Sequence, residues 1–339
     1  MTQRDSIRPI ITTPVRFSYW FMAGLFILIG ALHLATPLLA SLFAYLALAH
    51  LNFKRGGKWL PVAIFLLLLA AVAYVLGFVI NQSIRSLPEI ADKAIPGVIQ
   101  WAKQYQIELP FTDYDSLKDA AMEAIKSQVD YLNRFARIAR GATTQLVFLV
   151  VGCIVAISLF FHPRFEPGHN SDAAPGNLYS LSCAQIEQRF RTLYQSFATV
   201  MGAQVIIAAI NAVLTGIFVL VVHLPYAPVV IGMTFLCGLL PVIGNIISNT
   251  IVVGIGFTVS PRMAITALIF LVVIHKLEYL LNSKIVGWRI HNPLWLTLLA
   301  LVVGERLLGV PGIILAPVVL NYLRLEATQI RPTGEQTVG

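Results

Sequence analysis

Charged residues are scarce in this chain. Asp, Glu, Lys and Arg make up 12% of its 339 residues, whereas hydrophobic residues make up 57%. A typical soluble domain carries about 25% charged residues. The composition therefore excludes an ordinary soluble globular protein and predicts an integral membrane protein.

Cysteine is rare as well, and the basic residues, though in excess, are not clustered. Cys153, Cys183 and Cys237 are isolated, so neither a disulfide framework nor a CxxC metal site is expected, and we expect no cofactor. Lys and Arg outnumber Asp and Glu by 24 to 16, but they form no stripe with interleaved aromatic residues. This distribution argues against a nucleic-acid partner. The positive-inside rule of membrane proteins explains it better.

The stretch from Leu224 to Leu323 is almost entirely apolar, yet outside the segment Arg262 to Leu281 it lacks unbroken apolar runs of spanning length, because Pro and Gly divide it. The sequence PVIGN, at Pro241 to Asn245, separates one block at Val229 to Leu240 from a second block at Ile246 to Val259. Both blocks are shorter than the roughly 20 residues that a helix needs to cross about 30 Å of hydrocarbon.

The same arrangement returns near the C-terminus. There, GERLLGVPG at Gly304 to Gly312 separates Leu294 to Val303 from Ile313 to Leu323. The two pairs predict two helical hairpins that enter the membrane and turn back. Because non-helical backbone at membrane depth must be buried in protein or line a wet cavity, such paired breaks are the best indication of a transport site that a sequence offers.

Six further segments are predicted to be full-span helices. The Arg-bearing N-terminus and the link with Lys54, Arg55 and Lys58 are expected in the cytoplasm by the positive-inside rule, and this topology also leaves the C-terminus inside. The N-terminus lacks a signal-peptide pattern with a cleavage site. The predicted spans are Phe17 to Ala35, Leu38 to Leu51, Leu60 to Ile80, Ala142 to Phe161, Val200 to Val222 and Arg262 to Leu281.

The largest polar segment, Asn81 to Gly141, is expected outside the cytoplasm, and its acidic and basic residues balance. Ser116 and Asp119 form a candidate capping box for a helix running to about Arg140. We expect either a helical arm packed on neighbouring subunits or on the membrane surface, or a small self-contained helical hairpin.

A polar linker, His162 to Ser182, precedes a predicted amphipathic helix in the cytoplasmic interface. Its apolar face carries residues at helical spacing, and its charged residues lie off that face. The apolar residues are Ile186, Phe190, Leu193 and Phe197; the charged ones are Glu187, Arg189 and Arg191.

The fifth predicted span carries two polar and packing signals. Ala208, Ala212 and Gly216 form a small-xxx-small ridge that allows close approach of another helix. Gln204, Asn211 and Thr215 lie on a neighbouring face. Their side chains either line a substrate path or form hydrogen bonds between helices, and for each one the second reading is favoured.

Acids are almost absent from the C-terminal half: between Val200 and Leu323 only Glu278 and Glu305 occur. A charged group in a membrane segment is a functional candidate, because its burial costs at least about 2.5–3.5 kcal/mol. His275 lies three residues from Glu278 on the same helix face, which fits proton coupling or an interfacial cluster with Lys284. Glu305 is expected to cap the turn of the second hairpin or to pair with Arg306.

The tip of the first hairpin is a second candidate. Pro241, Gly244 and Asn245 would free backbone amides and carbonyls there, and Asn245 adds a side-chain amide. Helix ends that face a polar cavity can hold an ion or an anionic group.

Four motifs in this half resemble the autoinducer-2 exporter family of PerM-like permeases. They are the run ending PVIGN at Gly238 to Asn245, Glu278 to Gly287, HNPLW at His291 to Trp295, and GVPGIILAP at Gly309 to Pro317. Ser283 and Asn245 stand where the family pattern commonly has proline. The resemblance implies a multi-span, homo-oligomeric transporter, linked to export of small signalling molecules or to cation/proton antiport. It also implies family positions for Pro241, Gly244, Glu278, Lys284, Gly287 and Pro293.

The chain is therefore expected to be an all-α integral membrane protein with about six full-span helices, two Pro/Gly-broken re-entrant hairpins and a polar helical arm. Its predicted parts are membrane helices at 1–80, the arm at 81–141, a span at 142–161, a linker and amphipathic helix at 162–199, a transport region at 200–324 and a cytoplasmic tail at 325–339.

The leading functional hypothesis is a secondary transporter in the bacterial inner membrane. It would export a small polar solute or signal, with sodium or protons as candidate coupling ions. The alternatives are a sodium/proton antiporter and a non-transporting membrane scaffold. An enzyme is not expected, because HKLEY at His275 to Tyr279 lacks the second histidine of a zinc-protease HExxH helix and no serine sits in a nucleophile elbow.

Overall fold

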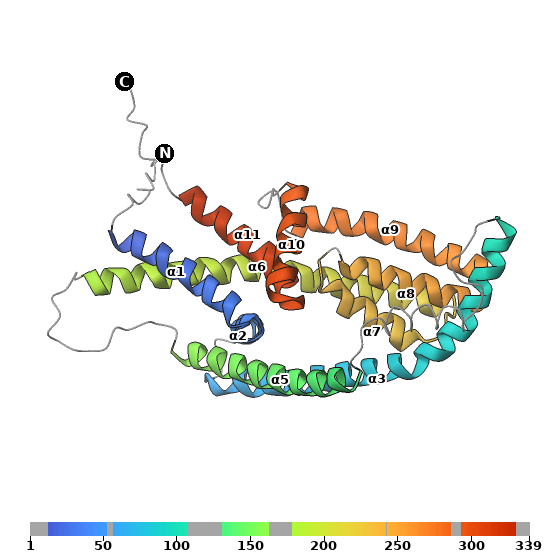
Figure 1. Cartoon of the computed structure of the whole chain (residues 1–339), viewed down its shortest axis with the longest axis horizontal. Coiled ribbons are helices and arrows are strands. Elements are labelled where there is room, and N and C mark those ends of the chain that lie inside the picture. Colours follow the sequence, from blue (N-terminus) through green and yellow to red (C-terminus); the bar gives the residue numbers. More distant parts are fainter. Residues whose placement is uncertain are drawn as a thin grey trace, which may run out of the picture. The chain divides into compact units, whose positions relative to one another are not determined.

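The chain is helical throughout the part that the structure describes (Figure 1). The structure is a computed structural model, and it describes residues 13–52, 57–106, 131–162, 178–241, 243–285 and 293–329, with no strand among them. Among the described helices, five are long and apolar enough to cross a membrane. They confirm the predicted all-α, multi-pass membrane protein, and they are Thr13–Ala31, Trp59–Ser83, Thr144–Phe161, Leu178–Val221 and Val310–Thr328.

The chain divides into two compact units, and three long helices contribute to both. One unit holds α1, α2, α5 from Gln145 onwards, α6 up to Met201, α10 and α11. The other holds α3 from Leu66 onwards, the rest of α6, and α7, α8 and α9. Each unit has its own buried apolar cluster.

A short turn separates the first two helices. Helix α1 is Thr13–Ala31 and α2 is Ala35–His50, and His33 between them has a positive φ of 53°. Helix α2 is among the shorter apolar helices, so its length falls below that of the five candidate spans.

The predicted spans on either side of the polar segment continue into it without a helix break. Helix α3 is Trp59–Gln104 and α5 is Tyr131–Phe161. Helix α3 passes through Pro88 and Pro96, so the change from apolar to polar residues after Ile80 does not end it. The candidate capping box at Ser116 and Asp119 lies outside the described residues.

The polar end of α3 packs on α8 (Ile243–Val259) in the same unit. The rings of Trp101 and Phe257 meet edge to face at 6.1 Å, and a Cβ added at Gly97 would lie 2.8 Å from the Phe257 carbonyl oxygen. On its exposed side, Lys93 Nζ lies 2.7 Å from Glu89 Oε1. That hydrogen bond holds the pKa of Glu89 below its usual range. An i, i+4 pair of this kind supports a solvent-exposed helix.

Helix α6, Leu178–Val221, joins the predicted interfacial helix and the fifth span into one element. Its buried stripe differs from the predicted one. Leu193 and Phe197 are buried as expected, but Phe190 is 39% exposed and Arg189 only 2% exposed. Arg189 was placed on the polar face, and this was wrong because a distant carboxylate, Glu326, neutralises its charge in the interior.

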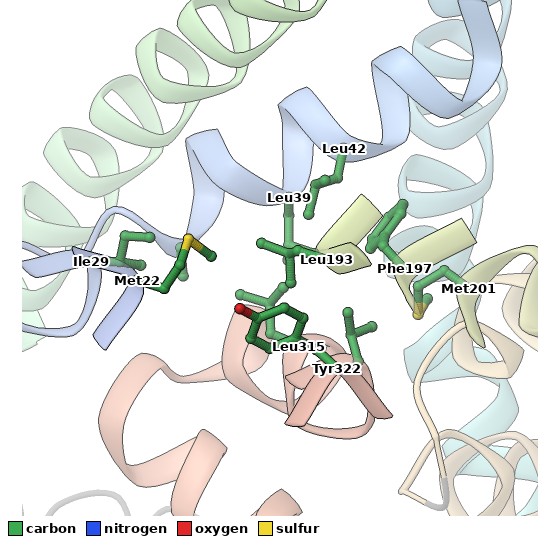
Figure 2. Close-up of a cluster of buried hydrophobic side chains, with 11 residues drawn as sticks. Met22, Ile29, Leu39, Leu42, Leu193, Phe197, Met201, Leu315 and Tyr322 are labelled. Atoms are coloured by element: carbon green, nitrogen blue, oxygen red, sulfur yellow. The ribbon is translucent and has the colours of Figure 1, made fainter. Parts of the chain in front are cut away.

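The core of the unit that contains α1, α2, α10 and α11 joins helices that are far apart in sequence (Figure 2). Met22 and Ile29 of α1, together with Leu39 and Leu42 of α2, meet Leu193, Phe197 and Met201 of α6. Leu315, Val318 and Tyr322 of α11 complete the cluster. Aromatic edge-to-face contacts reinforce it, such as Phe43 with Phe197 at 4.9 Å.

The break of the first predicted hairpin is confirmed. Helix α7 is Ala227–Gly238, α8 begins at Ile243, and α9 follows as Pro261–Ile285. The small-residue ridge of α6 allows the close approach that was predicted, since a Cβ added at Gly238 would lie 3.0 Å from Ala208 Cβ.

The second break is narrower than the sequence suggested. Helix α10 is Leu294–Leu308 and α11 is Val310–Gln329, so Gly309 alone interrupts them, with a positive φ of 65°. Glu305 and Arg306, predicted in the turn, lie in the last turn of α10 instead. The two helices pack closely where Gly304 of α10 meets Gly312 of α11. A Cβ added at either glycine would collide with the backbone of the other glycine.

Candidate functional site

One of the two units contains α7, α8, α9 and the second half of α6, and we call it the α6–α9 unit. Its central feature is a carboxylate held by two amides. Glu278 lies on α9, and its side chain is 13% exposed. Asn245 Nδ2, in the first turn of α8, donates to both carboxylate oxygens at 3.1 Å. Asn211 Nδ2, on α6, lies 3.4 Å from Glu278 Oε2. Three helices therefore converge on one acidic group.

His275 lies on the same face of α9, as the three-residue spacing predicted. Its Nδ1 is 3.9 Å from Glu278 Oε2, and its side chain is 56% exposed. The imidazole is therefore the more exposed of the two neighbouring ionisable groups.

These groups face a cavity of about 370 Å³ at the hairpin tip. A volume of this size lies in the range of small-molecule sites. Its wall carries one carboxylate and no lysine or arginine within the described residues. The lining residues are Gln204, Pro241, Asn245, Ile246, Asn249, His275 and Glu278.

The hairpin tip is held in place by backbone and side-chain contacts. Gln204 Nε2 of α6 donates to the Gly238 carbonyl, at the end of α7 where helical carbonyls lack internal partners. Ser248 Oγ of α8 donates to Thr234 Oγ1 of α7 at 3.2 Å. Gly244 is packed against the Cys237 carbonyl, so closely that a Cβ there would overlap it.

The structure brings most of the predicted site residues together. Gln204, Pro241, Asn245, His275 and Glu278 line the cavity, and Asn211 contacts Glu278 from behind. Gln204 and Asn211 also form the hydrogen bonds between helices that were the favoured alternative. Asn249 and Ile246, which line the cavity too, were not singled out from the sequence. Ile246 and Asn249 follow Asn245 by one and four residues, so the position of Asn245 at the broken run was a signal for them.

The remaining predicted residues lie elsewhere or beyond the description. Gly244 supports the tip and does not line the cavity. The side chain of Lys284 and the whole of Gly287 lie outside the described residues. Pro293 precedes α10 in the other unit and is exposed.

The arrangement suits binding more than bond-breaking chemistry. A carboxylate that accepts amide hydrogen bonds can attract a cation, exchange a proton or accept hydrogen bonds from hydroxyl groups. Asn211 Oδ1 is buried and has no hydrogen-bond partner among the described residues, so it is one more acceptor in this region. Across those residues no cluster of three His, Cys, Asp or Glu side chains could hold a metal ion.

A second polar cluster, in the other unit, was missed from the sequence. Arg189 of α6 pairs with Glu326 of α11, and both are buried. Glu326 was assigned to the cytoplasmic tail. The one available signal was that Arg189 lies three residues from Ile186 and four from Leu193, next to the apolar face.

Comparison with known proteins places this architecture among transporters. A model of the family described as AI-2E family transporter matches residues 17–324. A Bacillus subtilis protein named as a candidate transport protein, YdbI, is 30% identical over 131 residues, which is 38% of this chain and 37% of that relative. A Mycobacterium tuberculosis protein named in the same way, MT0215, is 23% identical over 335 residues, covering 92% of this chain and 89% of the relative.

Proposed function

The chain belongs to the AI-2E family of transporters, and from that premise we propose that the cavity at Glu278 is its solute site. In this proposal the protein is a secondary transporter that exports a small polar solute, such as the signalling molecule autoinducer-2. Access to the cavity alternates between the two sides of the membrane around the broken α7–α8 hairpin.

The observation that carries the proposal is the placement of Glu278. Its carboxylate interrupts a helix that is otherwise largely apolar, and it sits in the wall of a polar cavity with amides from α6 and α8. Ionisable groups in membrane segments are rare, and they commonly mark substrate or ion paths. Half-helices that end at such a cavity are a recurrent way to build a transport site.

Sodium/proton antiport is the second candidate. The proximity of His275 to Glu278 favours it, because an imidazole nitrogen can accept a proton and release it again. Against it, Glu278 is the single acid that lines the cavity within the described residues. Glu305 is exposed on α10 in the other unit.

The proposal includes the cellular setting. A helical multi-span transporter of this family would lie in the bacterial inner membrane, with both termini in the cytoplasm according to its basic residues. Its partners would be the solute, the lipid bilayer, and sodium or protons where transport is coupled. Further copies of the chain would complete a homo-oligomer.

The test is flux in proteoliposomes under an imposed pH or sodium gradient. Wild type is compared with Glu278→Gln, which keeps the side-chain size and removes the charge. Glu305→Gln is the matched control, because it makes the same change at an exposed position outside the cavity. We expect a loss of at least about tenfold in the first variant, equivalent to roughly 1.4 kcal/mol or more, and flux close to wild type in the control.

Two results would count against the proposal. Normal flux in Glu278→Gln would remove Glu278 from the mechanism. Absence of movement of protons, sodium and autoinducer-2 by the wild-type protein would favour the scaffold alternative.

A further inference from the structure

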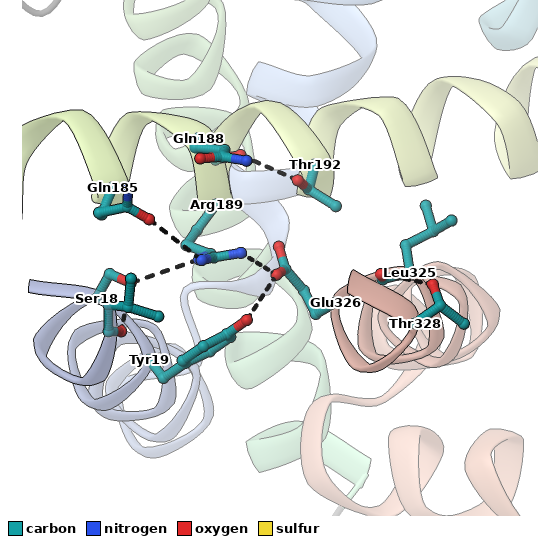
Figure 3. Close-up of polar contacts among 10 residues, drawn as sticks. Ser18, Tyr19, Gln185, Gln188, Arg189, Thr192, Leu325, Glu326 and Thr328 are labelled. Carbon is teal, nitrogen blue, oxygen red and sulfur yellow. Dashed lines mark hydrogen bonds and ion pairs between the residues drawn. The ribbon is translucent and has the colours of Figure 1, made fainter. Parts of the chain in front are cut away.

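A buried charged cluster joins three helices in the unit that contains α1, α2, α10 and α11 (Figure 3). It consists of Ser18 and Tyr19 from α1, Arg189 from α6, and Glu326 from α11, and we call it the Arg189 cluster. Arg189 and Glu326 are 2% and 4% exposed. The cluster lies near the start of α1 and α6 and near the end of α11, which share one membrane side in the predicted topology.

The guanidinium of Arg189 is surrounded by partners from all three helices. It donates to Glu326 Oε2, lies 3.4 Å from Ser18 Oγ and 3.3 Å from Gln185 Oε1, and stacks over the Tyr19 ring at 4.4 Å. The Tyr19 hydroxyl donates to the same Glu326 oxygen at 3.1 Å. Because one carboxylate oxygen receives both donors, loss of Glu326 would remove these polar contacts of α11 with α1 and with α6 together.

Two buried polar atoms in or beside the cluster lack hydrogen bonds within the described residues. Glu326 Oε1 and the Tyr322 hydroxyl are buried, yet neither has a hydrogen-bond partner among the described residues. Each buried polar atom left unpaired costs about 1–3 kcal/mol. A buried ion pair is commonly no more stabilising than apolar residues of the same volume. Stability alone is therefore a poor explanation for a charged pair here, whereas a contact that must open and close explains both the charge and the unpaired atoms.

From these contacts we propose that the Arg189 cluster is a latch, closed in this structure and opened in another state of the transport cycle. Helix α6 is the element that connects it to transport. The same continuous helix carries Arg189 and, further along, Gln204 and Asn211. Opening the latch removes the polar contacts of the first half of α6 with α1 and α11. That half can then shift over the apolar core that the three helices share when the second half responds to solute. The inference requires a transporter, but it does not require Glu278 to be the solute site.

The latch is tested by measuring distances between α1 and α11 in the full-length protein. Spin labels are attached at Trp20→Cys and Leu323→Cys, whose native side chains are 79% and 55% exposed, after replacement of the three native cysteines. Double electron–electron resonance in liposomes then gives the distribution of distances between the two labels without any solute. Short distances report the closed latch and long distances the open latch. We expect Glu326→Gln to raise the open population roughly tenfold, the factor that corresponds to about 1.4 kcal/mol.

Two further variants make the result decisive. Glu187→Gln removes an exposed carboxylate on the same helix, 3.1 Å from Arg191, and should leave the populations unchanged. Arg189→Gln breaks the same pair from its other member and leaves the buried Glu326 carboxylate without its cation. It therefore keeps the test open if Glu326→Gln does not fold, and it should also favour the open distance. Wild-type populations in both cluster variants, or an equal change in Glu187→Gln, would overturn the latch.

Discussion

The contact between Asn245 and Glu278 is the residue-scale feature on which the proposed site depends most. A double-mutant cycle with Asn245→Ala, Glu278→Gln and the combined variant measures their coupling. Contacting polar residues typically show a coupling of about 0.5–3 kcal/mol, and we expect a value in that range from thermal unfolding in detergent. Asn245→Ala alone should be the more destabilising single change, since it leaves a largely buried carboxylate with one weaker amide.

The control for this cycle pairs Asn245→Ala with Glu305→Gln. Glu305 lies in the other unit and is exposed, so the two effects should add without coupling. An equal coupling energy in both cycles would show that the value reflects general destabilisation and not the contact.

Individual residues differed in how far sequence could predict them. Glu278 stood out because acids are nearly absent from the apolar half, and Asn245 because it follows a proline and a glycine in a broken run. Arg189 and Glu326 did not stand out, because they pair with each other across 137 positions of the sequence. Local periodicity shows which residues share one face of a helix. It does not show that a distant residue of opposite charge allows a charged side chain to be buried.

At the scale of elements, the turn before α8 sets the position of Asn245. Gly244→Ala should impair transport about as strongly as Asn245→Ala, because the added Cβ would overlap the Cys237 carbonyl and displace the first turn of α8. Gly254→Ala is the matched control in the same helix, where an added Cβ meets no atom of the described residues within 4 Å. Proteoliposome flux checks both, and equal effects of the two variants would contradict this role of the turn.

Helix breaks were predictable from the sequence, whereas helix continuity was not. The breaks at Pro241 and Gly309 follow from backbone chemistry, since proline lacks an N–H and glycine tolerates positive φ. Helices α3 and α6 pass through changes from apolar to polar residues that suggested separate elements. Hydropathy follows the surroundings of a helix, and a helix that leaves the bilayer keeps its backbone hydrogen bonds.

For the whole molecule, the two units put the two polar features on different parts of the chain. The Glu278 site belongs to the α6–α9 unit and the Arg189 cluster to the unit with α1, α2, α10 and α11. Sequence reasoning found the first, since its acid and its broken helix are unusual within an apolar stretch. The second depends on the N- and C-terminal helices meeting, which no local pattern indicates.

The proposed topology makes a prediction for the whole chain. The polar end of α3 should be accessible from outside the cell and the link before α3 from the cytoplasm, because the polar segment carries balanced charge while the link carries Lys54, Arg55 and Lys58. Single cysteines at Gln100 and at Lys58, both exposed, are introduced after the native cysteines are replaced. In intact cells a membrane-impermeant maleimide should label Gln100→Cys, and label Lys58→Cys only after permeabilisation. The reverse pattern would invert the molecule in the membrane, and with it the direction in which the hairpin tip and its cavity face.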